Sequence, residues 1–334
     1  MALGFLTLVS HEIGHGHLHG QYALKCALES FGGEKIFIVN QDHNIDLSQF
    51  NFDNYVYFDL FAPTKTFLKC IKSSIFNLQL KTLFINLPKQ ALLKYEKILK
   101  HLHVKYIDIV FIDCPIHNLL NFCKLALNSL AHLERKTNLK HVYDGHQYFI
   151  PKPTISKTKK NNKGDKIFIC AGGTDAFNVT EILIKKLVSR LPKEEFYIII
   201  GSGNQNFFST DSVGKIKKNN YTLFKNVDNI GDLMVDCYCG VVGLGLTSME
   251  LRFFNIPCVL FSTNTHNYKV AEKISNCSQD CIHIGNPLNW NDQIFDVVSK
   301  FAMKARNSNF ITKKSKDSPV IGIELIKKYL SNDI

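Results

Sequence analysis

Short apolar segments alternate with segments of helical periodicity over most of this 334-residue chain. The apolar segments are rich in Ile, Val, Phe or Tyr and end at turn residues, so they predict strands at Gly4–Val9, Lys35–Val39, Tyr55–Phe58, Ile107–Ile112, Lys166–Cys170, Phe196–Ile200, Tyr221–Phe224, Tyr238–Val242, Pro257–Phe261 and Cys281–Ile284. The periodic segments predict helices at Gln21–Phe31, Lys65–Phe84, Pro88–Leu102, Asn118–Glu134, Val179–Arg190, Val227–Val235, Thr247–Phe254 and Tyr268–Ser275. Strands and helices in alternation predict an α/β fold, with parallel sheets that carry helices on both faces.

Two of the strands lead through a glycine turn into a helix. The N-terminal strand precedes Gly14 and Gly16, and the strand Lys166–Cys170 precedes Gly172-Gly173-Thr174-Asp175. A strand, a glycine turn and a helix together offer free backbone N–H groups and a positive helix end to a phosphate. The two junctions lie about 160 residues apart. They predict two doubly wound, Rossmann-like lobes that face one another with a cleft between them.

The length of the chain allows two domains, each with its own core. The composition changes at Pro151-Lys152-Pro153, and the following stretch Lys157–Lys166 is rich in Lys and Asn. We therefore predict an N-terminal lobe at 1–150 and a C-terminal lobe at 151–334. Two more helical segments, Phe295–Ala305 and Ile323–Leu330, end the chain, and the last helix is a candidate for returning to the first lobe.

Charge and cysteine content limit the class of partner. The formal net charge is +11, which either reflects lysines solvated on outer faces or serves to attract an anionic substrate or membrane face. The basic runs Lys157–Lys160 and Lys313–Lys316 lie far apart and contain no aromatic residue, which argues against a nucleic-acid partner. The ten cysteines form no CxxC pair, and the sequence has the pattern of neither a signal peptide nor a membrane span. We expect reduced thiols and a cytoplasmic protein.

His17 is the candidate general base of the first lobe. Ligands of open parallel sheets bind outside the carboxyl ends of the strands, and His17 follows the first strand at that end. A neutral imidazole there can take a proton from water or from a hydroxyl group. Two alternatives stay open. One is a metal site made with His11, His15 and His19, which lacks a nearby Cys or Asp to complete it, and the other is a histidine that only caps the turn.

Backbone amides of the second lobe form the candidate diphosphate site. The candidate binding residues are Gly172, Gly173 and Thr174 after one strand, and Leu246, Thr247, Ser248 and Glu250 after the glycine turn Gly243–Gly245. The alternative for the first group is an ordinary tight turn in which Thr174 or Asp175 caps a helix. For Glu250, the alternatives are a hydrogen-bond acceptor for ribose hydroxyls and a capping box with Thr247.

These motifs resemble those of the UDP-sugar hydrolase of pseudaminic acid biosynthesis, a relative of the MurG-like glycosyltransferases with the two-lobe GT-B fold. The residues that match its loop S-x-x-I-G-x-G-H and its segment F-I-C-x-G-G-T-D are Ser10, Ile13, Gly14, Gly16 and His17, and Phe168, Ile169, Cys170, Gly172, Gly173, Thr174 and Asp175. The resemblance covers about the first 40 residues and most of Gly145–Ser275. It implies that His17 is the base for water and that Asn264 orients water or sugar. It also implies that the second lobe holds UDP, with Ile230 lining the uracil pocket and Glu250 binding the nucleotide.

The chain departs from this family in the first lobe. The family's basic residue three positions after the histidine is Gly20 here, the aromatic hydroxyl expected just after Ile107–Asp113 is absent, and extra helices are predicted between Phe61 and Tyr106. These differences fall in the half of the protein that the resemblance assigns to the sugar.

From the residues and the resemblance together we expect a UDP-sugar hydrolase of bacterial glycan biosynthesis. It would release UDP from a UDP-linked 2,4-diacetamido-trideoxy sugar without a metal or a cofactor. The alternative is a GT-B glycosyltransferase, in which His17 deprotonates an acceptor hydroxyl and the apolar segment Leu68–Phe84, with its three lysines, is a candidate for peripheral contact with a membrane surface. A non-catalytic nucleotide-sugar binding module is the third possibility.

Overall fold

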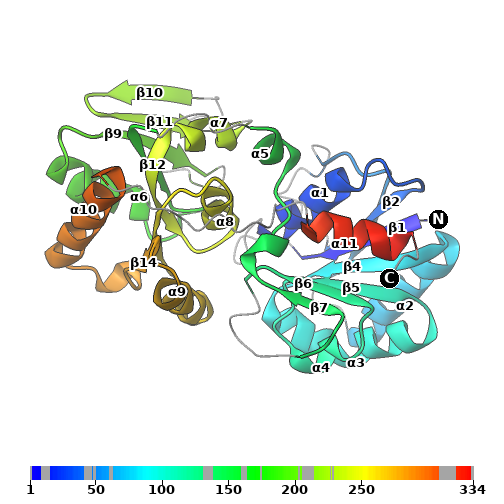
Figure 1. The fold of residues 1–334 in the computed structure, drawn as a ribbon. Coiled ribbons are helices and arrows are strands. Elements are labelled where there is room, and N and C mark those ends of the chain that lie inside the picture. The colour runs from blue at the N-terminus through cyan, green and yellow to red at the C-terminus, as the bar shows by residue number, and fades with distance from the viewer. Residues whose placement is uncertain are drawn as a thin grey trace. The chain divides into compact units, whose positions relative to one another are not determined.

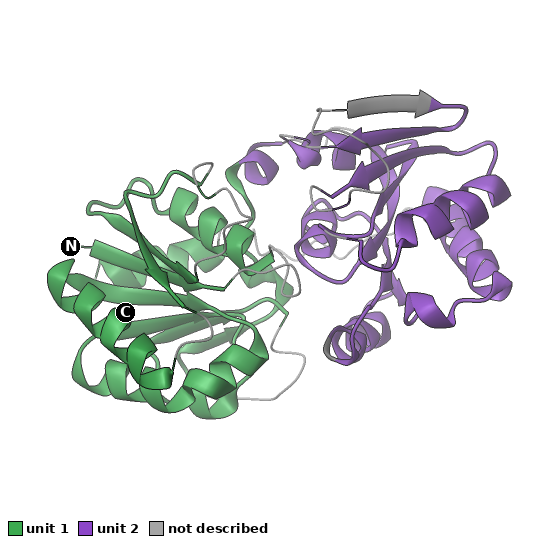
Figure 2. Ribbon diagram, turned by 180° about the vertical axis from the view of Figure 1, so that it is seen from behind, with its two compact units in different colours: residues 1–153, 316–334 green, residues 154–315 purple. Residues whose placement is uncertain are grey.

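The fold is that of a computed structural model of the whole chain (Figure 1). The residues that it describes are 2–8, 16–40, 47, 50–59, 63–130, 138–158, 164–173, 175–201, 204, 214–225, 227, 229–307 and 321–331. The chain divides into two compact units, coloured separately in Figure 2. Unit 1 comprises residues 1–153 and 316–334, and unit 2 comprises residues 154–315.

Unit 1 is built on a seven-stranded parallel sheet with the strand order β3-β2-β1-β4-β5-β6-β7. Its elements are β1 (Ala2–Thr7), α1 (Gly16–Ala27), β2 (Lys35–Asn40), β3 (Asn54–Phe58), α2 (Thr64–Asn77), β4 (Leu80–Asn86), α3 (Lys89–Lys105), β5 (Asp108–Ile112), α4 (His117–Leu120), β6 (Leu125–Asn128), β7 (Val142–Asp144), η3 (His146–Tyr148) and α11 (Ile321–Leu330). The chain builds β1, β2 and β3 outward in one direction and then returns to place β4 on the other side of β1. The order therefore reverses between β1 and β4.

Unit 2 has a second seven-stranded sheet with the order β10-β11-β9-β8-β12-β13-β14, in which only β10 is antiparallel to its neighbour among the described pairs. Its elements are α5 (Pro153–Lys157, starting at the division), β8 (Lys166–Cys170), α6 (Val179–Lys186), η4 (Val188–Arg190), β9 (Glu195–Ile200), β10 (Gly214–Lys218), β11 (Tyr221–Lys225), α7 (Ile230–Val235), β12 (Cys237–Gly243), α8 (Leu246–Phe253), β13 (Cys258–Phe261), α9 (Thr265–Cys277), β14 (Cys281–His283), η5 (Pro287–Asn289) and α10 (Asp292–Asn307). Here the order reverses between β8 and β12.

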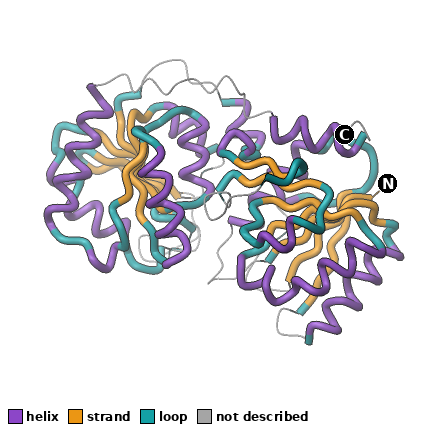
Figure 3. Tube along the Cα trace, turned by 60° about the horizontal axis from the view of Figure 1, so that its bottom comes forward, coloured by secondary structure: helices purple, strands orange, loops and turns teal. Residues whose placement is uncertain are grey.

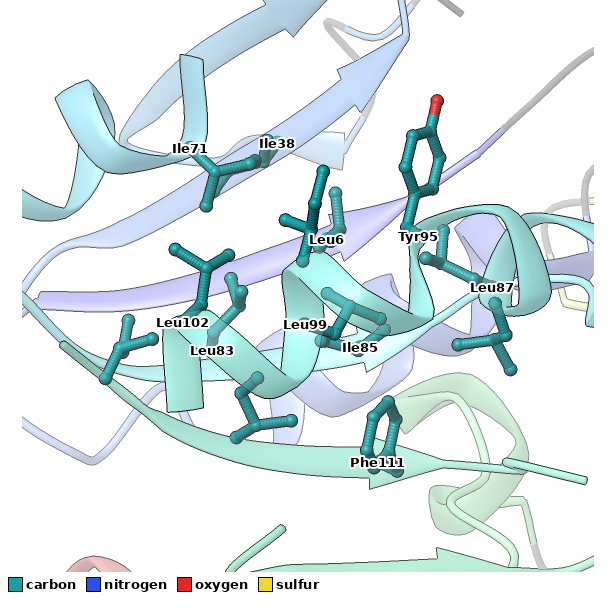
Figure 4. Close-up of a cluster of buried hydrophobic side chains, with 14 of the residues drawn as sticks. Leu6, Ile38, Ile71, Leu83, Ile85, Leu87, Tyr95, Leu99, Leu102 and Phe111 are labelled. Atoms are coloured by element: carbon teal, nitrogen blue, oxygen red, sulfur yellow. The ribbon is translucent and has the colours of Figure 1, made fainter. Parts of the chain in front are cut away.

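Each sheet carries helices on both faces, as the tube view shows (Figure 3). In unit 1, apolar residues of α2 and α3 cover one face of the sheet, and those of α1 and α11 cover the other. Figure 4 shows the first of these cores, where Tyr95, Leu99 and Leu102 of α3 pack over Leu6 of β1 and Ile85 of β4. Burial of a side chain of this size stabilises the fold by about 1.5–3 kcal/mol.

The C-terminal helix α11 packs in unit 1. Its residues Ile326 and Leu330 are buried, and the Tyr329 hydroxyl donates a hydrogen bond to Asp108 Oδ2 at 3.0 Å. A Cβ atom on Gly322 would lie 2.9 Å from the carbonyl oxygen of Tyr148, so glycine allows the helix to approach η3 closely. Within the described ranges, no helix combines the length and apolarity needed to cross a membrane.

Two predicted helices extend too far, and each includes residues of a strand of the sheet. The segment Lys65–Phe84 ends its helix at Asn77, turns at Gln79 with φ 50°, and continues as β4. The segment Asn118–Glu134 holds only the short α4 before β6 begins at Leu125. Strands β4 and β6 are buried along most of their length, and a continuous apolar run of this kind cannot be told from a buried helix by periodicity.

Candidate active-site residues

The points at which the strand order reverses locate one candidate site in each unit. In open α/β sheets, ligands bind outside the carboxyl ends of the strands where neighbouring crossovers diverge. In unit 1 this point lies between the ends of β1 and β4, and in unit 2 it lies between the ends of β8 and β12.

His17 and Asn86 meet at the switch point of unit 1. His17 is the second residue of α1, the helix that follows β1, and Asn86 is the last residue of β4. His17 Nδ1 lies 2.6 Å from Asn86 Oδ1. The imidazole is half-buried, and the asparagine is 6% exposed. Sequence reasoning predicted the histidine and missed the asparagine, because β4 was taken for a helix.

The carboxyl ends of β5, β6 and β7 continue this polar edge. Asp113, which follows β5 in a left-handed conformation with φ 54°, accepts hydrogen bonds from the Ser129 hydroxyl at 2.9 Å and from the backbone N–H of Leu130 at 2.8 Å. The Asn128 side chain accepts from the N–H of Cys114 and donates to Asp144 Oδ1, both at 2.9 Å. A polar residue at the end of each apolar run is the sequence signal that could have predicted this row of polar residues at the carboxyl ends of the strands.

The glycine turn after β8 is open on the side where side chains would project. Gly172 has φ +97°, a conformation that favours glycine, and a Cβ atom on either Gly172 or Gly173 would meet no heavy atom within 4 Å. On the other side the turn packs tightly, because a Cβ atom on Gly201 would lie 2.3 Å from the carbonyl oxygens of both glycines. The backbone of the turn is thus held firmly while one side stays accessible. Thr174 and Gly14 lie outside the described residues.

Asp175 occupies the N-terminus of α6. Its carboxylate accepts hydrogen bonds from the backbone N–H groups of Val179 at 2.7 Å and Thr180 at 3.0 Å, and from Asn204 Nδ2 at 3.2 Å. Asp175 as a whole is 6% exposed. A buried negative charge already interacts with the positive end of this helix, so α6 is a poor place for a phosphate.

Helix α8 begins differently, without a carboxylate in its first turn. Its N-cap is Gly245, whose carbonyl oxygen accepts from the Ser248 hydroxyl at 2.7 Å and whose N–H donates to that hydroxyl at 3.3 Å. A Cβ atom on Gly245 would meet nothing within 4 Å. The proposed capping box of Thr247 with Glu250 is therefore wrong, because the cap is Gly245 and its reciprocal partner is Ser248.

The side chains of Cys170, Thr247 and Glu250 gather between β8 and α8. Burial raises the pKa of the Cys170 thiol to about 11, while hydrogen bonds from the backbone of Gly172 and the side chain of Thr247 act in the opposite direction. Glu250 is 4% exposed and adds to the rise electrostatically. Loops from both strands of the switch point thus bring Gly172, Gly245, Thr247 and Glu250 to one region, with Leu246 and Ser248 in the first turn of the same helix.

Two more helices of unit 2 begin at the same edge of the sheet. Asn264 is the exposed N-cap of α9 and accepts a hydrogen bond from the N–H of Asn267 at 2.8 Å. Ile230, half-buried, is the first residue of α7, which Asn229 caps. The observed contact of Asn264 is a capping bond, and its role toward a sugar stays a prediction.

The described part of the N-terminal histidine cluster consists of His17 and His19, whereas His11 and His15 lie outside the described residues. His19 packs edge-on against the ring of Phe50, with 5.5 Å between centroids. Among described residues, no group of three or more His, Cys, Asp or Glu side chains is arranged to hold a metal ion.

Comparison with known proteins places this geometry in a fold class. No protein-family model matches the chain. An uncharacterized protein of Methanocaldococcus jannaschii is 23% identical over 285 residues, which are 79% of this chain and 56% of that protein. The chain therefore spans about half the length of the curated relative it matches.

Solved structures similar to the chain include several glycosyltransferases. They include the calicheamicin glycosyltransferase CalG4 (TM-score 0.64, 10% identity, 99% of this chain and 98% of that one) and MurG of Acinetobacter baumannii (0.63, 13%, 98% and 99%). A third is the spinosyn rhamnosyltransferase SpnG complexed with thymidine diphosphate (0.63, 11%, 99% and 96%). The chain thus has the GT-B fold of two Rossmann-like α/β units, which confirms the predicted fold class. The predicted cleft between the lobes stays a prediction.

Proposed function

We propose that the protein is a glycosyltransferase that uses a nucleotide-sugar donor. Unit 2 binds the nucleoside diphosphate of the donor, and His17 of unit 1 accepts the proton of an acceptor hydroxyl. The observation that carries the proposal is the pair of switch points, one with a hydrogen-bonded histidine and the other with two open glycine turns. The similar structures support it, since they are glycosyltransferases and one of them is complexed with thymidine diphosphate.

The chemistry follows from the residues at the two points. The acceptor oxygen attacks the anomeric carbon of the donor while its proton passes to His17, and the bond from that carbon to the diphosphate breaks. Backbone N–H groups of the Gly172 turn and of the start of α8 stabilise the charge that develops on the leaving diphosphate. The proposal requires no cofactor and no metal ion.

Hydrolysis is the second candidate, and the sequence motifs favour it. The loop ending in His17 and the segment Phe168–Asp175 resemble those of the UDP-sugar hydrolase of pseudaminic acid biosynthesis. Water would then replace the acceptor hydroxyl, and the products would be UDP and a free 2,4-diacetamido-trideoxy sugar.

A product assay separates these functions. The protein is incubated with UDP- and TDP-sugars, with and without simple glycosides and lipid-linked sugars as acceptors, and free nucleoside diphosphate and free sugar are measured. Release that requires an acceptor supports transfer, and equal release in its absence supports hydrolysis. If calorimetry shows that UDP binds but no donor is turned over, the protein is a binding module and both enzymatic proposals fail.

The assignment of the base has its own test. His17→Ala should lower turnover by about 10²–10⁴-fold, the range for a lost general base, with little change in UDP affinity. His19→Ala is the matched control, because His19 lies on the same helix and packs against Phe50. Normal turnover in His17→Ala would make Asp113 the next candidate.

A further inference from the structure

We propose that Asn86 is a positioning residue that holds the His17 ring in the tautomer with the proton on Nδ1. This inference rests on the proposed role of His17. It adds the identity of the basic nitrogen and the residue that fixes it.

The chemistry of an amide decides the tautomer. The atom of Asn86 that faces His17 Nδ1 at 2.6 Å is the side-chain oxygen, which has lone pairs and no proton. A hydrogen bond between the two atoms therefore requires Nδ1 to carry the proton. The neutral imidazole then has its lone pair on Nε2, the nitrogen that can take a proton from an acceptor.

The surrounding residues hold the amide in place. Asn86 ends the buried strand β4, and its backbone carbonyl oxygen accepts a hydrogen bond from the Thr7 hydroxyl of β1 at 3.1 Å. One turn after His17, the Gln21 side-chain amide donates to the carbonyl oxygens of Leu6 and Phe84, at 2.9 and 3.0 Å. Gln21 thereby fixes α1 over the gap between β1 and β4, and with it the position of His17.

Gly20 provides the space that the amide needs. A Cβ atom at this position would lie 2.8 Å from Asn86 Nδ2, closer than real Cβ atoms come to a neighbour. Any larger residue at position 20 would displace the amide or α1. This contact explains, in this chain, the glycine at the position where the resembled family has a basic residue.

The amide of Asn86 orients the imidazole without adding charge. A carboxylate in its place would orient the imidazole and would also add a negative charge. A carboxylate favours the imidazolium form, so Asn86→Asp should raise the pH at which His17 is half protonated by about one unit or more. Because the base must be neutral, the acidic limb of the pH profile of kcat/KM should move to higher pH by the same amount. Asn86→Ala should lower kcat by about 10- to 100-fold, with a smaller change in KM, because the ring loses its hydrogen bond and its fixed tautomer.

The experiment combines these profiles with NMR of the wild-type protein. Histidine-labelled protein is compared with His17→Asn to assign the His17 ring nitrogens, and their ¹⁵N shifts report which nitrogen carries the proton. The expected result is a proton on Nδ1 in the wild type and a shift toward Nε2–H in Asn86→Ala. Asn77→Asp is the matched control for added charge, because Asn77 is exposed at the end of α2.

The outcomes distinguish this inference from the proposed function. A wild-type proton on Nε2, or an acidic limb that moves equally in Asn86→Asp and Asn77→Asp, overturns the role of Asn86 whatever the reaction is. If the NMR result is as expected but His17→Ala turns over normally, the proposed base is wrong and Asn86 orients a ring with no catalytic role. The NMR measurement on the wild-type protein needs no substrate and no folded Asn86 variant.

Discussion

Replacement of Asp175 tests whether the Asp175 carboxylate already occupies the N-terminus of α6 and stabilises it. In Asp175→Ala, the backbone N–H groups of Val179 and Thr180 lose the carboxylate that they contact at 2.7 and 3.0 Å. Loss of a side-chain acceptor for the first N–H groups of a helix costs about 0.5–2 kcal/mol, as at an N-cap, and loss of the bond from Asn204 costs about 1–2 kcal/mol more. For a unit of this size, the combined loss of about 1.5–4 kcal/mol lowers the melting temperature of unit 2 by about 3–15 °C.

Differential scanning calorimetry of the full chain measures this effect. Asp175→Asn keeps one acceptor oxygen and should show about half of the loss. Asp292→Ala is the matched control, because Asp292 is also at the start of a helix but pairs with Lys186 and Arg190 on an exposed surface, where ion pairs contribute little. It should melt close to the wild type.

UDP titration of the same variants tests whether the diphosphate binds at the start of α8 or at the start of α6. If the diphosphate binds at the open start of α8, Asp175→Asn should change UDP affinity little at a temperature where it is folded. If the diphosphate instead binds at the start of α6, removal of the competing negative charge should tighten UDP binding. Tighter UDP binding would refute the placement of the diphosphate at the start of α8. A melting temperature of Asp175→Ala within about 1 °C of the wild type would refute the stabilising role of Asp175 at the start of α6.

The remaining predictions concern the nucleotide, the glycine turn, metal and thiols. Glu250→Ala should weaken UDP binding by about 10- to 150-fold by calorimetry if it loses a charge-assisted bond to ribose, whereas Asn264→Ala should keep UDP affinity and lose turnover. Gly172→Ala should destabilise unit 2 by about 1–3 kcal/mol in denaturant titrations, because its φ of +97° strains any side chain. Turnover should survive exhaustive EDTA treatment, and rescue by zinc or manganese after a loss would contradict this. At pH 8 the Cys170 thiol should resist iodoacetamide in the folded protein, since it is buried and its pKa is raised to about 11, which leaves very little thiolate at that pH, while the exposed Cys277 should react.

The sequence predicted the fold class well because the signals for it are local and repeated. Apolar runs with glycine turns at β1 and β8 were enough to indicate two doubly wound sheets, and strand and helix alternation fixed their parallel character. The central strand β4 was not predicted, because only Leu78 and Gln79 separate it from α2. Its residues Leu83-Phe84-Ile85 continue an apolar pattern that also suits a buried helix.

That one error had a consequence for the site. Because the segment up to Phe84 was predicted as a helix, Asn86 was not recognised as the end of a strand. His17 was therefore predicted without its hydrogen-bond partner. The sequence Asn86-Leu87-Pro88 carries a usable signal, because Pro88 precedes α3 and a polar residue ends the apolar run before it. The capping role of Gly245 was missed for a different reason, since Thr247 is also a good N-cap and only the backbone conformation decides between them.

The two units share a topology, and we propose a different chemical role for the switch point of each. In unit 1 the switch point is lined by side chains, His17 and Asn86, which can exchange or orient a proton. In unit 2 the backbone turns at Gly172 and Gly245 lie at the switch point beside the side chains of Thr247 and Glu250, and backbone N–H groups can bind an anion without titrating. It follows that the first point should be sensitive to isosteric changes such as Asn86→Asp, which alter charge and leave shape. The second should fail when a Cβ atom is added at either glycine, because there the bound group and the N–H groups must come into direct contact.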